Sequence, residues 1–369
     1  MRGFKERRAL PIILVWCCML PALALAGTAA NVAPPPPAGI DGSASEPAYA
    51  RAWLDRIHAA ARLANYQGTM VFTSGGVLSS MRVAHFCIGE QSYERIEALD
   101  GRLQRVYRHN DVVQTMWPQA RLALVESRSV STQLRSLTAA AEPRALEQYE
   151  MKPEGSERVA GREAWVFLMK PRDDLRYAQR LWADQASGLM LRADVINPAR
   201  VVLESAAFSE VEIGIRPSPD SVLQPMKKLA GYRVLRPQQV PTQLASEGWT
   251  MAREVPGFVL KGCLKRPLEA PPADDDPAPN AKAGAGTAAR AAQPPPVQQV
   301  LQAVFSDGLT HVSLFIEPYE PQRHKALLQA QMGSTSTLMQ RRGDYWITAM
   351  GDVPATTLKL FTDALERRR

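Results

Sequence analysis

The chain has 369 residues, of which 44 are lysine or arginine and 37 are aspartate or glutamate, so its formal net charge is +7. This length accommodates two domains with cores of their own. Because no run of basic residues is dense enough to indicate nucleic-acid binding, we expect a globular protein with no nucleic-acid partner.

The first 26 residues have the pattern of a cleaved secretory signal. An apolar run at residues 9–25 ends in Ala24-Leu25-Ala26, and Pro11 and Pro21 interrupt it, which favours cleavage over a membrane anchor. Four basic residues precede the run: Arg2, Lys5, Arg7 and Arg8. Since the signal also carries one acidic residue, cleavage lowers the net charge from +7 to +4. The mature protein is then expected in the periplasm of a Gram-negative bacterium.

A flexible tether and a helix are predicted next. Residues 27–47 are rich in Ala, Pro, Gly and Ser, a composition typical of linkers. From residue 48 onward apolar residues recur at helical spacing and predict one amphipathic helix with an apolar stripe. These residues are Trp53, Ile57, Ala60, Ala61 and Ala64.

Residues 66–126 predict a succession of antiparallel strands. Apolar and polar residues alternate at 70–72, 81–86, 106–109 and 113–117, the period of a sheet with one buried face. Turn-forming pairs separate the segments about every ten residues. They are Gly75-Gly76, Gly89-Glu90, Asp100-Gly101, Asn110-Asp111 and Pro118-Gln119.

The alternation is lost at residues 127–146, which we interpret as helix and loop, a candidate movable cover. It returns in five further segments, two of which are joined by a hairpin loop at residues 184–188. The predicted strands are 158–161, 164–170, 177–183, 189–196 and 201–215. The first domain is thus predicted to span residues 48–215, with about ten strands that curl around the helices or close.

A second, smaller domain is predicted at residues 229–369, after a Pro-rich linker at 216–228. A Pro-, Ala- and Gly-rich insertion at 267–299 is expected to be disordered. Pro354 is expected to begin a closing helix with Leu358, Phe361 and Leu365 on one face. The predicted strands are 232–235, 258–260, 303–305, 312–316, 336–340 and 345–350, with a turn at 341–344 between the last two.

No catalytic or metal-binding pattern emerges. The chain lacks a Gly-x-Ser-x-Gly elbow, a His-Glu-x-x-His pair and a Cys-x-x-Cys pair, and its five histidines are scattered. We therefore expect neither an enzyme nor a protein with a cofactor or metal. Only Cys87 and Cys263 remain after cleavage. A disulfide between them and two free buried thiols are both open, because two cysteines carry no spacing information.

Apolar and aromatic residues accumulate along the first set of strands. Each one alone fits a core, but together they suggest a concave sheet with more apolar surface than one helical layer covers, and hence a cavity for acyl chains. The candidates are Met70, Phe72, Met81, Val83, Tyr107, Met116, Trp117, Phe167 and Trp182.

Several short motifs resemble a known family. Leu181-Trp182-Ala183-Asp184, followed by Gly188-Leu189-Met190-Leu191-Arg192, is similar to a hairpin of lipoprotein-carrier-like proteins of the LolA type. Joined in order to Tyr66-Gln67-Gly68-Thr69, Ser306-Asp307-Gly308-Leu309 and Gly351-Asp352-Val353-Pro354, it makes the chain resemble the RseB/MucB family of sigma-E regulators.

That resemblance implies an α+β, mainly antiparallel fold, with an unclosed, lipoprotein-carrier-like N-terminal β-barrel packed on helices and a smaller C-terminal α+β domain. It also implies a periplasmic negative regulator that binds the periplasmic segment of a single-span anti-sigma factor of the RseA/MucA type and shields it from proteolysis. Lipid or lipopolysaccharide acyl chains are the implied signal, and homodimerisation stays open.

From the pattern of the second domain we choose six candidate peptide contacts: Tyr232, Arg233, Trp249, Phe258, Tyr345 and Trp346. A periplasmic lipid or lipoprotein carrier is the alternative function.

Overall fold

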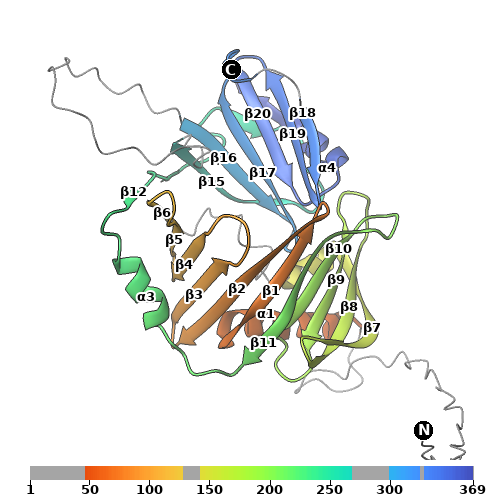
Figure 1. Ribbon diagram of the computed structural model, residues 1–369. Helices are drawn as coiled ribbons and strands as arrows, with labels where there is room; N and C mark the ends of the chain where they lie inside the picture. The colour runs from red at the N-terminus through yellow and green to blue at the C-terminus, as the bar shows by residue number, and fades with distance from the viewer. Residues whose placement is uncertain (1–45, 128–141, 268–298, 325–327, 369) are drawn as a thin grey trace, which may run out of the picture. The chain divides into compact units, whose positions relative to one another are not determined.

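The computed structural model describes residues 46–127, 142–267, 299–324 and 328–368 (Figure 1). All of them belong to one compact unit. The signal, nearly all of the tether, most of the candidate cover and the interior of the 267–299 insertion lie outside the described residues.

A twelve-stranded sheet dominates the first part of the chain. Its strands follow in the order β12-β6-β5-β4-β3-β2-β1-β11-β10-β9-β8-β7, and β12 and β7 do not pair with each other in the described part of the chain, so the sheet is unclosed. All neighbours are antiparallel except β12 and β6. The first eleven strands are β1 (Tyr66–Ser74), β2 (Val77–Ile88), β3 (Gln91–Ala98), β4 (Arg105–His109), β5 (Val112–Trp117), β6 (Leu122–Ser127), β7 (Tyr149–Val159), β8 (Arg162–Pro171), β9 (Ala178–Asp184), β10 (Met190–Ile196) and β11 (Val202–Ile213). The predicted strands and the predicted turns from Gly75 to Gln119 are confirmed, but burial does not alternate as a sheet with one buried face requires, since residues 83–86 and 113–116 are buried without a break.

Helix α1 (Glu46–Leu63) packs its apolar stripe on this sheet, as predicted. Trp53, Leu54 and Ile57 are fully buried, and the indole of Trp53 lies 5.2 Å from the ring of Phe167 in β8. A short 3₁₀ helix, η2 (Pro143–Glu147), packs beside α1. The apolar residues of α1 therefore supply the core over the β7–β10 half of the sheet.

The predicted linker contains structure that the sequence reasoning missed. Helix α3 (Asp220–Lys227) lies against β3 and β4, with Val222 fully buried (Figure 1). The strand predicted at 232–235 is β12 (Arg233–Leu235), and it pairs with β6 of the large sheet instead of joining the second domain. The prediction was wrong on this point because a three-residue strand carries no signal for its distant partner.

The second part of the chain forms a seven-stranded antiparallel sheet, ordered β13-β15-β16-β17-β20-β19-β18, and a two-stranded sheet of β14 and β21. Helix α4 (Ala355–Ala364) packs on β19 and β20 and buries Leu358 and Phe361, as expected. The strands are β13 (Val240–Pro241), β14 (Trp249–Met251), β15 (Val259–Pro267), β16 (Gln299–Ser306), β17 (His311–Pro318), β18 (Leu328–Met332), β19 (Thr335–Arg342), β20 (Tyr345–Gly351) and β21 (Leu365–Arg367). The sequence predicted five of these strands and missed β13, β14, β18 and β21, which are short or amphiphilic.

Candidate functional site

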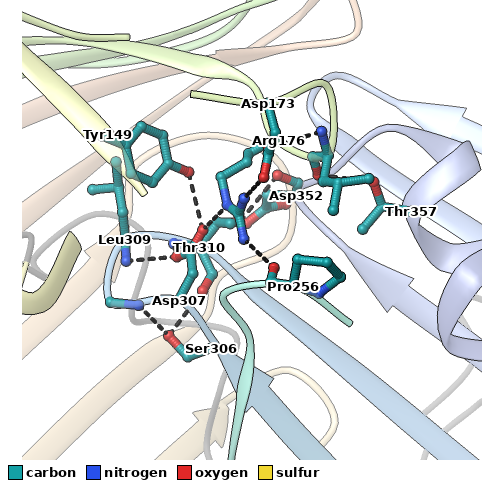
Figure 2. Close-up of polar contacts among 12 residues, drawn as sticks. Tyr149, Asp173, Arg176, Pro256, Ser306, Asp307, Leu309, Thr310, Asp352 and Thr357 are labelled. Atoms are coloured by element: carbon teal, nitrogen blue, oxygen red, sulfur yellow. Dashed lines mark hydrogen bonds and ion pairs between the residues drawn. The ribbon is translucent and has the colours of Figure 1, made fainter. Parts of the chain in front are cut away.

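A buried ion pair joins the β8–β9 connection to the β16–β17 turn (Figure 2). The Nε atom of Arg176 donates a 2.7 Å hydrogen bond to Oδ2 of Asp307, and both side chains are fully buried. The other guanidinium nitrogens bind the Asp173 carboxylate and, at 2.7 Å, the Pro256 carbonyl oxygen. We call Tyr149, Asp173, Arg176, Pro256 and Asp307 the Arg176 junction.

Asp307 uses both of its carboxylate oxygens in this junction. Oδ1 accepts hydrogen bonds from the backbone N–H groups of Leu309 (2.9 Å) and Thr310 (2.8 Å). Oδ2 accepts from Arg176 and from the Tyr149 hydroxyl at 3.2 Å (Figure 2). The four donors, one of which is the Arg176 cation, compensate the Asp307 carboxylate for its loss of water on burial. The carboxylate then has little capacity left to bind another group. The junction is built to hold two sheets together.

Two glycines allow the backbones to approach the junction. A Cβ atom at Gly257 would lie 2.4 Å from Cδ of Gln148 and 2.5 Å from Nη2 of Arg176. At Gly308 it would lie 2.6 Å from Cγ of Arg144, and both glycines have positive φ. Only glycine satisfies both the conformation and the space at these positions.

The charges of the junction shift the pKa values of its members. Burial raises the pKa of Tyr149 well above its usual range, and the Asp307 charge raises it further. Burial acts to lower the pKa of Arg176, but the hydrogen bonds and charges of Asp307 and Asp173 outweigh that effect and raise it. Arg176 is therefore a permanent cation, and the tyrosine stays a neutral donor.

A second polar contact joins the β18–β19 turn to the ends of β1 and β11. The Ser334 hydroxyl donates to Oε2 of Glu204 at 2.8 Å, and Thr335 Oγ1 donates to Oδ1 of Asp352 at 2.6 Å. Ser74 of β1 contributes a longer bond of 3.4 Å to the same Glu204 oxygen. We call Ser74, Glu204, Ser334, Thr335 and Asp352 the Glu204 junction.

The Glu204 junction differs from the first in having no cation. Among the described residues no ion pair involves Glu204. Burial raises the pKa of its carboxyl group, and the nearby Asp352 raises it further, against the hydrogen bonds from Ser334 and Ser74.

Neither junction was found by sequence reasoning, although Asp307 lies in one of the motifs quoted for the family resemblance. Arg176 and Glu204 carry no local signal at all.

The nine lipid-cavity candidates do not share one surface. Met70, Val83 and Trp182 belong to one apolar cluster, with Phe72 and Met81 packed against it. Tyr107 and Met116 lie in another cluster beneath α3, and Phe167 lies in a third beneath α1. Trp117 is half-buried at the end of β5. Since adjacent residues of a strand point to opposite faces, a selection by residue type alone mixed the two faces of the sheet.

Most of the candidate peptide contacts are core residues. Trp249, Phe258 and Trp346 are 2%, 7% and 5% exposed, and Tyr345 stacks edge-on against Trp249 at 5.1 Å. Tyr232 packs against the cluster beneath α3, which leaves Arg233 in β12 as the one exposed candidate of the six. Buried aromatic rings stabilise the strands that carry them, and they offer a peptide no surface.

The two cysteines are free thiols. Cys87 pairs with Ser92 across the large sheet, whereas Cys263 pairs with Ala303 in the seven-stranded sheet. Since both thiols are free, the disulfide left open above is not formed; Cys263 is buried, as the alternative expected, but Cys87 is only half-buried. Burial raises the pKa of Cys263 to about 11, which keeps this thiol protonated near neutral pH.

Two further findings bear on the kind of site. Within the described residues no group of three or more His, Cys, Asp or Glu side chains could hold a metal ion. Over the same residues no helix has the length and apolar character needed to cross a membrane. The polar features that stand out in the described residues are the two junctions that join the sheets.

Comparison with known proteins identifies the family. The model of the MucB/RseB N-terminal domain matches residues 49–227, and the model of the MucB/RseB C-terminal domain matches residues 243–366. The chain belongs to the MucB/RseB family.

The relatives carry names that describe regulation. "Sigma factor AlgU regulatory protein MucB" of Pseudomonas aeruginosa is 27% identical over 322 residues, which cover 85% of this chain and 90% of that protein. "Sigma-E factor regulatory protein RseB" of Escherichia coli K12 is 21% identical, with the same coverage of 85% and 90%.

Solved structures share the fold. The complex of Pseudomonas aeruginosa MucA and MucB matches with a TM-score of 0.61 and 25% identity, covering 87% of this chain and 99% of the solved chain. A structure of MucB in complex with MucA(peri) matches with a TM-score of 0.59 and 24% identity, covering 86% and 98%. The expected mainly antiparallel α+β architecture with an unclosed large sheet is thereby confirmed.

Proposed function

We propose that this chain is a negative regulator of a sigma-E-type envelope stress response. In this proposal it binds the periplasmic segment of a single-span, MucA-like anti-sigma factor and protects that segment from regulated proteolysis. The observation that carries the proposal is the match of both family models, in order, to residues 49–227 and 243–366. The complex of MucA and MucB, at 25% identity to this chain, supports an anti-sigma factor as the partner.

Regulation by binding alone fits the residues of the chain. In the Arg176 junction the guanidinium binds the carboxylates of Asp307 and Asp173 and the Pro256 carbonyl oxygen, so these groups are engaged with one another. The signal predicted at residues 1–26 would deliver the protein to the periplasm, where the partner segment lies. We propose a role in binding and no catalytic role, which the regulatory names of the relatives support.

A direct binding measurement tests the proposal. Mature protein is titrated with the periplasmic segment of the anti-sigma factor encoded in the same genome, and binding is followed by calorimetry. We expect saturable binding and slower cleavage of the segment by its site-1 protease. The control is the same segment with its residue order scrambled. Absence of saturable binding would refute the proposed function.

Lipid sensing by the large sheet is the finer part of the proposal. Phe72 and Met81 pack against a buried apolar cluster but are themselves only half-buried, so apolar surface remains within reach of an acyl chain. A lipid that binds more tightly to a conformation with low affinity for the peptide would shift the protein toward that conformation. The anti-sigma segment would then be released.

Native mass spectrometry separates this role from that of a carrier. A sensor should lose the anti-sigma segment when lipopolysaccharide or lipid is added. A carrier should instead hold stoichiometric acyl cargo and transfer it to an acceptor. Retention of the peptide at saturating lipid would contradict the sensing part of the proposal and leave peptide binding intact.

A further inference from the structure

The edges of the sheets differ in how well they are protected. An unpaired edge strand attracts other strands, and proteins guard such edges with proline, charges, bulges or shortness. Edge β7 contains Pro153, five charged side chains and a register shift between Pro153 and Gly155. Edge β12 has three residues including Arg233, and edge β13 has two, of which one is Pro241.

Strand β18 has none of these features. Figure 1 shows it as the outermost strand of the seven-stranded sheet, beside β19. Its five residues, Leu-Gln-Ala-Gln-Met, contain no charge and no proline, pair with β19 without a register shift, and are all exposed. Over the described residues no strand pairs with its outer side. The remaining edges belong to β14 and β21, which have only three residues each, so β18 is the one edge strand longer than three residues in the described part of the chain that lacks such protection.

The register shows which backbone groups face outward. Gly333 and Ser334 form a two-residue loop, and Gly333 has a φ of +58°. Such a loop closes on a hydrogen-bonded pair, here Met332 and Thr335. Because hydrogen-bonded and non-hydrogen-bonded pairs alternate along antiparallel strands, the N–H and C=O groups of Gln329 and Gln331 point away from β19.

The side chains around this edge define the chemistry of an added strand. Leu328, Ala330 and Met332 share one face of the sheet, where they continue the exposed row that includes Met350. On the other face the Gln331 amide donates to the Tyr177 hydroxyl at 3.3 Å, which ties this edge to the β8–β9 connection of the large sheet. The edge thus suits an uncharged segment of about five residues, roughly 17 Å long, with apolar side chains on one face.

We propose that β18 is the edge to which an extended segment of the anti-sigma factor adds as a further antiparallel strand. The inference rests on the proposed function for the identity of the partner. Backbone hydrogen bonds to Gln329 and Gln331 give the affinity, and the Leu328 and Met332 side chains select apolar residues at alternate positions, as in other cases of strand addition.

A proline substitution tests this assignment. Gln329→Pro removes one outward N–H group and leaves the bonds to β19 in place, since proline is tolerated on the open side of edge strands. We expect it to weaken binding of the periplasmic segment by about tenfold or more, which corresponds to about 1.4 kcal/mol. The matched control Gln329→Ala shortens the same side chain but keeps the N–H group, and its affinity should change by less than about twofold.

Hydrogen exchange on the wild-type protein gives a readout that does not depend on a variant. The amides of Gln329 and Gln331 should become protected when the segment binds. If wild-type protein binds the segment while Gln329→Pro binds equally well, or if protection appears elsewhere, the assignment is wrong and the proposed function survives. Protection of these amides without peptide, together with a dimer mass, would assign the edge to a second copy of the chain and overturn the proposal. Failure of the wild-type protein to bind would refute both.

Discussion

The two polar junctions both join the two sheets, but one contains a carboxylate paired with a cation and the other a carboxylate without one. Both join the seven-stranded sheet to the large one through a carboxylate, but Asp307 is fully buried at the β16–β17 turn, whereas Glu204 is half-buried in β11. Asp307 faces a guanidinium and three further donors, whereas Glu204 faces hydroxyl groups and lies close to a second carboxylate, Asp352. The guanidinium and three further donors fix the paired carboxylate in place, whereas burial and the nearby Asp352 raise the pKa of the unpaired one. The Arg176 junction should therefore be the firm contact, and the Glu204 junction the one that responds to conditions.

Removal of the cation should break the firm contact. Arg176→Ala leaves Asp307 buried without its charge partner, and we expect a loss of about 3–5 kcal/mol in the free energy of unfolding by urea. The control is Arg105→Ala, which removes a partly exposed pair with Glu97 at 2.9 Å and should cost at most about 1 kcal/mol. Similar small losses in both variants would show that the Arg176 junction does not hold the sheets together.

Crowding the same junction should have a smaller effect, and the chain offers a matched pair of glycines. Gly257 and Gly161 both have a φ of +76°, but only Gly257 lacks room for a Cβ atom. Gly161→Ala should cost about 1–2 kcal/mol from the backbone conformation alone.

Gly257→Ala adds the displacement of the Gln148 side chain and the Arg176 guanidinium, so its cost should be higher by about 1–3 kcal/mol. Thermal unfolding of both variants at one pH measures the difference. Equal costs would mean that Gln148 swings away freely and that the guanidinium is not held in place.

The large sheet was predictable because its signal is local. A pattern of apolar and polar residues marks segments of β1, β2, β4 and β5, and four of the five predicted turns carry glycine or asparagine at positions with positive φ. Helix α3 escaped prediction, and the predicted strand β12 was assigned to the wrong sheet, because nothing in this Pro-rich segment indicates that Val222 packs on the large sheet or that β12 pairs with β6. Such elements are specified by tertiary contacts that no local pattern records.

The candidate site was less predictable for the same reason. Trp249 and Trp346 were chosen as peptide contacts from the pattern of the second domain, yet their burial depends on partners such as Tyr345 and His324. Arg176 and Asp307 are 131 residues apart in the chain and meet only after both sheets have formed. Aromatic residues such as these two tryptophans attract attention as binding residues in a sequence, but they are also common in hydrophobic cores.

The responsive contact can be tested through pH. Because the pKa of Glu204 is higher in the folded chain than its ordinary value of 4.5, the folded state binds more protons as pH falls toward that value. The stabilisation is complete below pH 4.5 and is lost as pH rises through the folded-state pKa. Glu204→Gln removes this dependence, so the stability of wild type relative to the variant should increase as urea unfolding is repeated at lower pH.

Asp184→Asn provides a contrast of opposite sign. Burial acts to raise the pKa of Asp184, but hydrogen bonds from Arg162 and Ser187 outweigh it and leave the pKa below its ordinary value of 3.8. This carboxylate stabilises the fold above pH 3.8 and loses its contribution as pH falls through the folded-state pKa. Wild type should therefore lose its advantage over Asp184→Asn in acid, where it gains against Glu204→Gln. If both variants moved in the same direction with pH, the contrast between an unpaired carboxylate, Glu204, and a paired one, Asp184, would be wrong.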